Sequence, residues 1–201
     1  MGKIITIAHQ KGGVGKSTLA MNLALCFQNS LSVALVDTDL QGSLYHIRED
    51  FPELNIVNAD ELANIRALPQ DLIIVDTPPY LSSRLPDLFA QSDFILVPTK
   101  AGFFDVMAIR STIALIREAL AAAPELRAGI VLNMVKPRSG ITKDVSELLE
   151  QMEVGLLKTM IHDRVSIARS SMTAGVLMGS DPKAKDELMA LAEEVVELIS
   201  V

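Results

Sequence analysis

The chain has 201 residues, of which 49% are apolar and 21% charged, so it has the length and composition to bury a core and is not disordered. Its formal net charge of −7 excludes a polycation that coats nucleic acid through overall charge. The single cysteine, Cys26, excludes an intramolecular disulfide and is too few for a zinc or iron–sulfur site within one chain, which fits a reducing cytoplasm.

The N-terminal region has no targeting signal. The first apolar run, residues 4–8, follows Met1, Gly2 and Lys3 directly, without the basic region, long apolar stretch and cleavage site of a signal peptide. Nowhere does an apolar run approach the roughly 20 residues needed to span a bilayer. We therefore expect a cytoplasmic protein that does not associate with membranes.

Short β-branched or aliphatic runs alternate with longer segments of helical periodicity. The runs are continuously apolar, which is typical of parallel strands covered on both faces by helices. The sequence therefore predicts an α/β fold, a doubly wound and mostly parallel sheet with helices on both faces, in a single domain over residues 1–201. The predicted strands cover residues 4–8, 32–36, 72–75, 94–98 and 129–132, and the predicted helices cover 17–28, 106–123, 142–152 and 183–199.

A glycine-rich loop between the first predicted strand and helix has the strand–loop–helix context of a phosphate-binding loop. Its glycines let backbone N–H groups close on a polyphosphate, and the helix N-terminus adds partial positive charge. We expect Lys16 to reach the outer phosphates and the Ser17 hydroxyl to ligate Mg²⁺, so the predicted ligand is a nucleoside triphosphate. The loop consists of Lys11, Gly12, Gly13, Val14, Gly15, Lys16, Ser17 and Thr18.

Carboxylates stand at the ends of the second and third predicted strands. Asp37 and Asp39 follow the second strand, and Asp76 follows the third. Taken alone, paired aspartates at a strand end are more often helix caps or turn formers. Because open α/β sheets bind ligands at the carboxyl ends of their strands, the phosphate loop favours a chemical role instead. We expect Asp76 to hold Mg²⁺ through a water molecule, and the turn at residues 77–79 to sense the γ-phosphate.

The loop departs from the common pattern G-x-x-x-x-G-K-[ST], because Gln10 replaces the first glycine and an extra lysine, Lys11, lies inside it. This arrangement resembles the deviant Walker A motif of the ParA/MinD family of P-loop ATPases, with the small ParA-type partition ATPases as the nearest match. The resemblance implies ATP or ADP and Mg²⁺ as cofactors. It also implies that Lys11 reaches across a dimer interface to the partner's nucleotide, where a second cation offsets phosphate charge.

Two further segments carry the resemblance. Residues 36–42 are similar to the family's D-x-D-P-Q segment, with Leu40 in place of the proline; this implies that Asp39 lies near the attacking water and Asp37 near the Mg²⁺ shell. Residues 131–138 resemble the segment whose asparagine recognises adenine, since an amide pairs with a base edge as donor and acceptor together. Asn133 is therefore the predicted adenine contact, with a turn-forming asparagine as the alternative.

The resemblance covers essentially the whole chain, because residues 161–165, 174–175 and 183–201 are similar to the family's last strand, loop and helix. It implies an ATPase that is monomeric or ADP-bound when inactive and a homodimer with ATP and Mg²⁺. Lys11, Lys16 and Asp39 form its catalytic set, and a ParB-like or other adaptor stimulates a low intrinsic turnover. The implied output is segregation or positioning of a plasmid, a chromosome or a protein cluster.

Nonspecific DNA is the implied surface partner. Residues 127–169 carry a net charge of +2 within the acidic chain. Such a stretch is more often simply solvated, so charge alone is weak support, and the expectation of nucleoid association in the ATP state comes mainly from the resemblance. The candidate DNA contacts are Arg164, Arg169 and Lys158.

Features that this sequence lacks argue against several subgroups of the family. No segment precedes the first strand to form a helix-turn-helix, and the acidic last helix opposes the membrane attachment of MinD-like relatives. Cys26 alone does not provide the cysteines of nitrogenase-reductase relatives. Two alternatives stay open: an ATP-switched scaffold that recruits a partner without DNA, and a metabolic enzyme such as an ATP-dependent amidoligase, for which 201 residues leave little room. The histidines, interpreted as structural or surface residues, are His9, His46 and His162.

Overall fold

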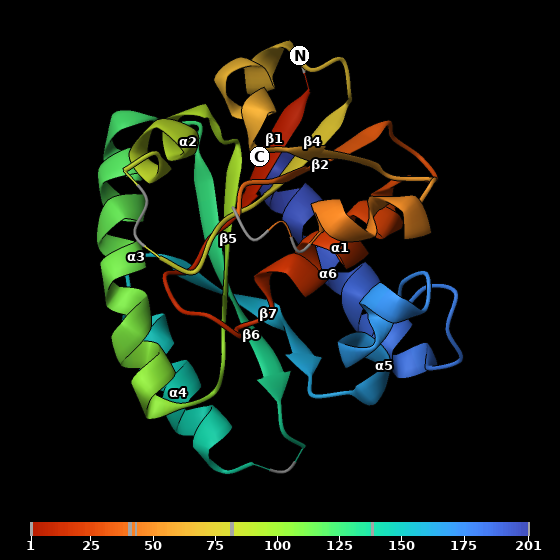
Figure 1. Cartoon of the computed structure of the whole chain (residues 1–201). Coiled ribbons are helices and arrows are strands. Elements are labelled where there is room, and N and C mark those ends of the chain that lie inside the picture. Colours follow the sequence, from red (N-terminus) through yellow and green to blue (C-terminus); the bar gives the residue numbers. More distant parts are fainter. Residues whose placement is uncertain (1, 40–41, 43, 81–82, 138, 201) are drawn as a thin grey trace.

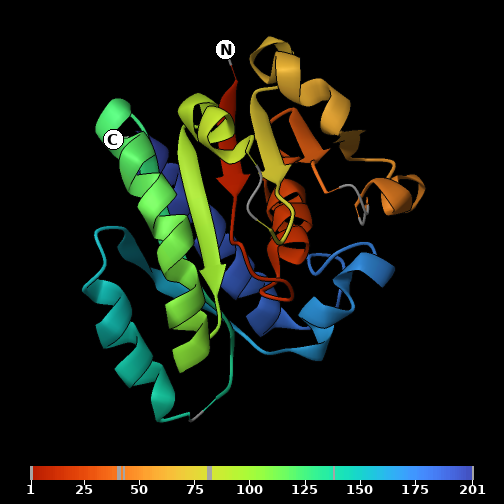
Figure 2. The same cartoon turned by 60° about the vertical axis from the view of Figure 1, so that its left-hand side comes forward.

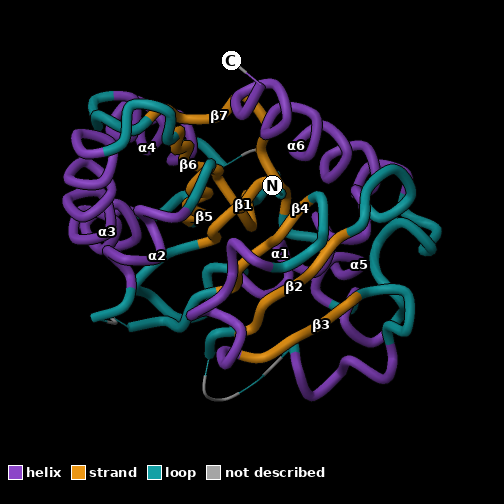
Figure 3. The backbone as a smooth tube through the Cα atoms, turned by 90° about the horizontal axis from the view of Figure 1, so that it is seen from above, coloured by secondary structure: helices purple, strands orange, loops and turns teal. Residues whose placement is uncertain are grey.

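The computed structural model describes residues 2–39, 42, 44–80, 83–137 and 139–200. In this part of the chain, parallel strands form a sheet in the order β3-β2-β4-β1-β5-β6-β7, which Figure 3 shows as a row from β3 at the lower edge to β7 at the upper edge. The strands are β1 (Lys3–Ile7), β2 (Val33–Asp37), β3 (Asn55–Asn58), β4 (Leu72–Asp76), β5 (Phe94–Thr99), β6 (Arg127–Val135) and β7 (Gly155–His162).

Helices cover both faces of the sheet (Figures 1 and 2). They are α1 (Lys16–Phe27), α2 (Leu85–Gln91), α3 (Phe103–Ala122), α4 (Ile141–Glu150), α5 (Val165–Ala168) and α6 (Pro182–Ser200), with 3-10 helices η1 (Tyr45–Asp50), η2 (Ala59–Ala67) and η3 (Ser170–Met172). α1 and α6 pack together on one face, and α2, α3 and α4 pack on the other.

Strand β5 illustrates why the buried runs are continuously apolar. Phe94 and Leu96 pack into the layer beneath α1 and α6, whereas Ile95 and Val97 pack beneath α3. Successive side chains of a strand point to opposite faces, so a strand covered on both faces needs an apolar residue at every position. The prediction of a doubly wound parallel sheet with helices on both faces is therefore confirmed.

Besides the four-residue α5 and the 3-10 helices, the sequence did not predict β3 and α2. Both are short, with 4 and 7 residues, and β3 buries only Ile56 fully, so neither leaves a long periodic signal. β7 also begins at Gly155, ahead of the stretch from residue 161 assigned to the last strand. As an edge strand that is partly exposed, β7 lacks the continuous apolar run that marks the central strands. No helix in the described part of the chain is both long and apolar enough to cross a bilayer.

Candidate nucleotide-binding site

The predicted site residues converge at the carboxyl ends of β1, β4 and β2. β4 lies between the other two strands, and the register places Asp76 opposite Asp37 on one side and opposite Ile7 on the other. The loop that follows β1 therefore faces the carboxylates that end β2 and β4. A cleft of about 270 Å³ opens there, lined by Gly12, Gly13, Gly15, Lys16, Ser17, Thr18, Asp39, Thr77, Pro79 and Met134.

The loop between β1 and α1 takes its shape from glycines with left-handed backbone. Gly13 has φ 70° and Gly15 has φ 94°, a region that L side chains rarely adopt. Gly15 is the N-cap residue of α1 and also faces Asn133, whose Nδ2 would lie 2.2 Å from a Cβ at this position. Because α1 starts at Lys16, its unpaired N–H groups and partial positive charge face the cleft. The backbone thus forms the anion-binding loop that the sequence predicts.

Lys16 lies beneath this loop and is 6% exposed. Its Nζ donates to the carbonyl oxygen of Lys11 at 3.2 Å. Burial lowers the pKa of the Lys16 ammonium, while Asp76 and Asp39 act in the opposite direction. The ammonium is therefore held between the loop backbone and the carboxylates, where bound phosphates would provide it with stronger partners.

Asp76 is a buried carboxylate without compensation. It is 1% exposed, and among the described residues neither of its oxygens has a hydrogen-bond partner in good geometry. Burial raises the pKa of Asp76 to about 7; the neighbouring Ser17 hydroxyl and Lys16 lower it, and Asp37 and Asp39 raise it. A carboxylate and a hydroxyl are the oxygen ligands that Mg²⁺ prefers, so Asp76 and Ser17 fit the predicted metal.

We expect Asp76→Asn to stabilise the ligand-free protein by about 4 kcal/mol at pH 8, because it removes a buried charge. The pKa of Asp76 is raised from 3.8 to about 7. In the pH window between these two values, the folded state retains a proton that the unfolded state has lost. Wild-type stability therefore decreases as the pH rises through the window, and the advantage of the variant shrinks toward pH 4. Urea unfolding from pH 4 to 8 measures this, with exposed Asp163→Asn as the control; a pH-independent difference would contradict it.

The carboxylate of Asp37 is engaged by the loop that follows β2, and its place near the Mg²⁺ shell stays a prediction. It is 2% exposed, and its carboxylate accepts hydrogen bonds from the backbone N–H groups of Asp39, Leu44 and Tyr45 at 3.1, 2.8 and 3.0 Å. The geometry therefore gives Asp37 the function of shaping the loop that carries Asp39 into the cleft. Leu40, the departure from the family pattern, lies outside the described residues.

Asp39 and the turn after β4 complete the cleft wall. Asp39 is partly exposed and lies close enough to Lys16 to affect its pKa. The Thr77 hydroxyl donates to the carbonyl oxygen of Ile7 at 2.9 Å, which fastens the turn at residues 77–79 to the end of β1. The loop, Asp39 and this turn are thus brought together around one space, as the sequence analysis expects.

Lys11 is held within its own chain. Its Nζ lies 2.6 Å from Oδ1 of Asp105, in the first turn of α3, and its backbone N–H donates to His9 Nδ1 at 2.9 Å. Burial lowers the pKa of His9 to about 4, with the charge of Lys16 adding to the effect, so the ring is neutral and accepts this bond. The sequence analysis missed Asp105 and gave His9 no part in the site, since no motif spacing marks either residue.

Asn133 contacts the phosphate loop. Its Nδ2 donates to the carbonyl oxygen of Val14 at 2.8 Å, and its Oδ1 accepts from the N–H of Met134 at 2.9 Å. Met134 has φ 54°, and its side chain lines the cleft. Both ends of the Asn133 amide are thus engaged by backbone, and its recognition of adenine stays a prediction.

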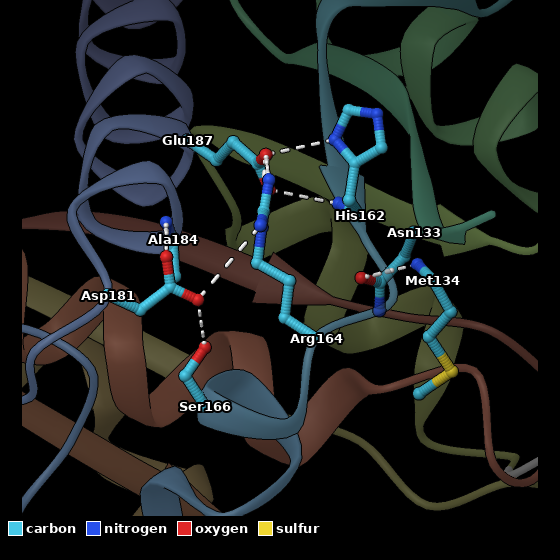
Figure 4. A network of polar contacts seen from close by, with 8 residues as sticks. All are labelled: Asn133, Met134, His162, Arg164, Ser166, Asp181, Ala184 and Glu187. Atoms are coloured by element: carbon cyan, nitrogen blue, oxygen red, sulfur yellow. Dashed lines mark hydrogen bonds and ion pairs between the residues drawn. The ribbon is translucent and has the colours of Figure 1, made fainter. Parts of the chain in front are cut away.

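The structure separates the candidate DNA contacts. Arg164 is engaged within the chain: its Nη2 donates to Oε1 of Glu187 at 2.6 Å, and its Nη1 lies 4.0 Å from Asp181, as Figure 4 shows. His162 also contacts Glu187, at 2.9 Å from Nδ1. This network joins the end of β7 to α6. A phosphate contact by Arg164 would have to compete with Glu187, whereas Lys158 and Arg169 are exposed.

We expect Arg164→Ala to lower the free energy of unfolding by about 1–2 kcal/mol, because Glu187 loses its charge-assisted partner. The matched control is Arg169→Ala, which alters an exposed arginine five positions further along the chain and is expected to change stability by less than about 0.5 kcal/mol. Urea unfolding of both variants at pH 7 measures the difference. Equal, small effects in the two variants would show that the Glu187 network contributes no stability.

The cations of residues 127–169, the segment with net positive charge, do not all lie close together. Arg127 begins β6, and Lys136 follows its end. Nine residues of strand span about 30 Å, so these two cations lie at opposite ends of β6. A DNA-binding surface would therefore have to form from part of the segment only.

The geometry of the cleft identifies the class of protein to which the chain belongs. A left-handed glycine loop at the start of a helix, a buried lysine beneath it and an unpaired carboxylate at the end of the adjacent strand form the site of a P-loop nucleotide-binding protein. A family model described as the CobQ/CobB/MinD/ParA nucleotide binding domain matches residues 5–175. The chain belongs to this family, and the ParA/MinD resemblance of its sequence is confirmed.

Individual relatives agree with this assignment. The "Maintenance of carboxysome distribution protein A" of Halothiobacillus neapolitanus is 31% identical over 96% of this chain and 95% of its own. A putative plasmid partition protein of Borrelia burgdorferi, bound to AMPPNP, has the same fold, with a TM-score of 0.75 and 21% identity over 100% of this chain and 99% of its own. The septum site-determining protein MinD of Pyrococcus horikoshii, complexed with Mg-ADP, gives a TM-score of 0.73 and 19% identity over 98% and 97%.

Proposed function

We propose that the chain is a ParA-like ATPase, a single domain over residues 1–201, that pairs into a homodimer with ATP and Mg²⁺ and hydrolyses ATP slowly. The observation that carries the proposal is the arrangement of Lys16, Ser17 and the uncompensated Asp76 around one cleft. Relatives that bind AMPPNP or Mg-ADP in the same fold support these ligands. The homodimer would place Lys11 of each copy at the partner's nucleotide.

The residues divide the chemistry among them. The loop backbone and Lys16 bind the phosphates, Ser17 ligates Mg²⁺, and Asp76 holds it through a water molecule. Held by these residues, Mg²⁺ would neutralise the charge that develops during phosphoryl transfer. Asp39 orients the water for in-line attack, and Asp37 supports Asp39 by holding its loop. Asn133 fixes the loop and contacts adenine.

The expected biological output is the positioning of cargo in the cytoplasm. One relative maintains carboxysome distribution and another is a putative plasmid partition protein, which supports a protein cluster, plasmid or chromosome as cargo. The ATP-bound homodimer would associate with the nucleoid through nonspecific DNA contacts, and a ParB-like or other adaptor would stimulate hydrolysis. The engagement of Arg164 by Glu187 favours a second candidate, an ATP-switched scaffold that recruits a partner without binding DNA.

The two candidates are distinguished by DNA binding. We would measure fluorescence anisotropy of a labelled nonspecific duplex with MgATP or MgADP over a salt series. The DNA-binding proposal expects ATP-dependent binding that Lys158→Ala/Arg169→Ala weakens, with a salt slope reduced by about 0.9 for each phosphate that the variant no longer neutralises. The exposed Lys143→Ala serves as the control. Dimerisation with ATP but no DNA binding with either nucleotide would exclude the first candidate and support the scaffold.

A further inference from the structure

The resting position of Lys11 carries an inference beyond the ligands of the site. Its ammonium forms an ion pair with Asp105 at 2.6 Å, with the lysine side chain 40% and the aspartate side chain 14% exposed. Asp105 comes from the first turn of α3, 94 residues further along the chain. The same lysine is the one that the proposed homodimer directs to the partner's nucleotide.

Asp105 is itself held in place. Its backbone N–H donates to the carbonyl oxygen of Gly102 at 3.0 Å, which starts the first turn of α3. A Cβ on Gly102 would lie 2.6 Å from Oδ2 of Asp105, so the glycine leaves the space that the carboxylate occupies. His9 holds the backbone of Lys11 at the same time, so both partners of the ion pair have a further contact that positions them.

The ion pair is also linked to the phosphate-binding lysine. Lys16 donates to the carbonyl oxygen of Lys11, and the ammonium of Lys11 contacts Asp105. In the ligand-free chain the two lysines of the loop are therefore linked to each other and to Asp105. Phosphates attract the Lys16 ammonium more strongly than a neutral carbonyl does. Nucleotide binding would therefore draw Lys16 away from Lys11 and leave the contacts of Lys11 with His9 and Asp105.

We propose that Asp105 is a positioning residue that holds Lys11 on its own chain until two nucleotide-bound copies pair. This inference rests on the proposed function, in which Lys11 crosses to the partner's nucleotide. One ammonium has to exchange the Asp105 carboxylate for phosphate oxygens, and the exchange leaves an unpaired carboxylate near the phosphates. Asp105 thus opposes pairing and sets the protein concentration at which the homodimer forms.

The test compares pairing in Asp105→Asn with that of the wild type. Sedimentation equilibrium with AMPPNP and Mg²⁺ is expected to give an Asp105→Asn dimer dissociation constant about fivefold lower, the effect of losing one half-exposed ion pair. Asp144→Asn, the same change in the first turn of α4, is the control for a general effect of a charge at a helix start. Gly102→Ala is a second variant, which displaces the carboxylate and is expected to favour pairing without removing the charge.

A double-mutant cycle identifies the residue through which Asp105 acts. In a Lys11→Ala background, Asp105→Asn is expected to have no effect on pairing, because the lysine that it positions is absent. Unchanged or weaker pairing in Asp105→Asn, or an equal effect in both backgrounds, overturns the inference while the proposed function stands. A wild type that stays monomeric with AMPPNP and Mg²⁺ overturns the proposed function and this inference with it.

Discussion

Lys16→Ala is expected to raise the dissociation constant for MgATP at least about 100-fold. Lys16 is 6% exposed, and it belongs to the loop at the start of α1 that binds the phosphates in our proposal. Charge-assisted hydrogen bonds contribute about 1.5–3 kcal/mol each, and about 2.8 kcal/mol corresponds to about 100-fold in affinity. Isothermal titration calorimetry with MgATP and MgADP measures the loss.

The control for this prediction is Lys143→Ala, an exposed lysine on α4 that forms an i,i+4 pair with Glu147. It is expected to bind both nucleotides as the wild type does. Because Lys16 also affects the pKa of buried Asp76, each variant is first tested for folding by urea unfolding without nucleotide. A folded Lys16→Ala protein with wild-type affinity would contradict the assignment of the cleft as the phosphate site.

Asp39→Ala is expected to lower the rate of ATP hydrolysis by about 100-fold and to leave MgATP binding within a few-fold of the wild type. Its carboxylate lines the cleft but, unlike Lys16, is not part of the loop that cradles phosphates. Removal of a residue that orients or deprotonates the reacting water costs about 10²–10⁴-fold in rate. The phosphate released in single-turnover assays measures this step, and the homodimer should accumulate with ATP.

Asp37→Ala provides the informative comparison for Asp39→Ala. Asp37 contacts three backbone N–H groups of the following loop, so its removal is expected to lower both stability and hydrolysis. Asp39→Ala is expected to lower hydrolysis alone. If Asp39→Ala also abolished MgATP binding, the assignment of Asp39 to the water would be wrong, and a function in nucleotide or metal binding would replace it.

The part of the site that the sequence predicted consists of residues adjacent in the chain. Residues 11–18 combine a strand end, glycines and a helix start, so local pattern alone identifies the loop and its ligand. Asp76 was predicted for the same reason, because it directly follows an aliphatic strand. The central strands were predicted from their continuous apolar runs. The short elements β3 and α2 were missed, and the start of the partly exposed β7 was placed too late in the chain.

The part that the sequence did not predict depends on contacts across the fold. Asp105 meets Lys11, and Asn133 meets Val14, over separations of 94 and 119 residues. Asp37 is satisfied by backbone amides, which carry no signal in residue identity. Arg164 was chosen because it falls at a basic position of the family beside the last strand, but its environment is set by Glu187 on a helix 23 residues away. Such pairings become visible only when the topology fixes which elements are neighbours.

The order of strands in the sheet has a consequence for the synthesis of the protein. β1 leaves the ribosome before β4 and β5, the strands with which it pairs, whose residues begin at Leu72 and Phe94. Until those strands emerge, the central strand has two unpaired edges, which are liable to associate wrongly. The phosphate loop gains its hydrogen bond from Asn133 only after β6 has emerged. Nascent chains that end before residue 94 are therefore expected to be protease-sensitive and unable to retain nucleotide, so the phosphate loop is made early but reaches its working form late.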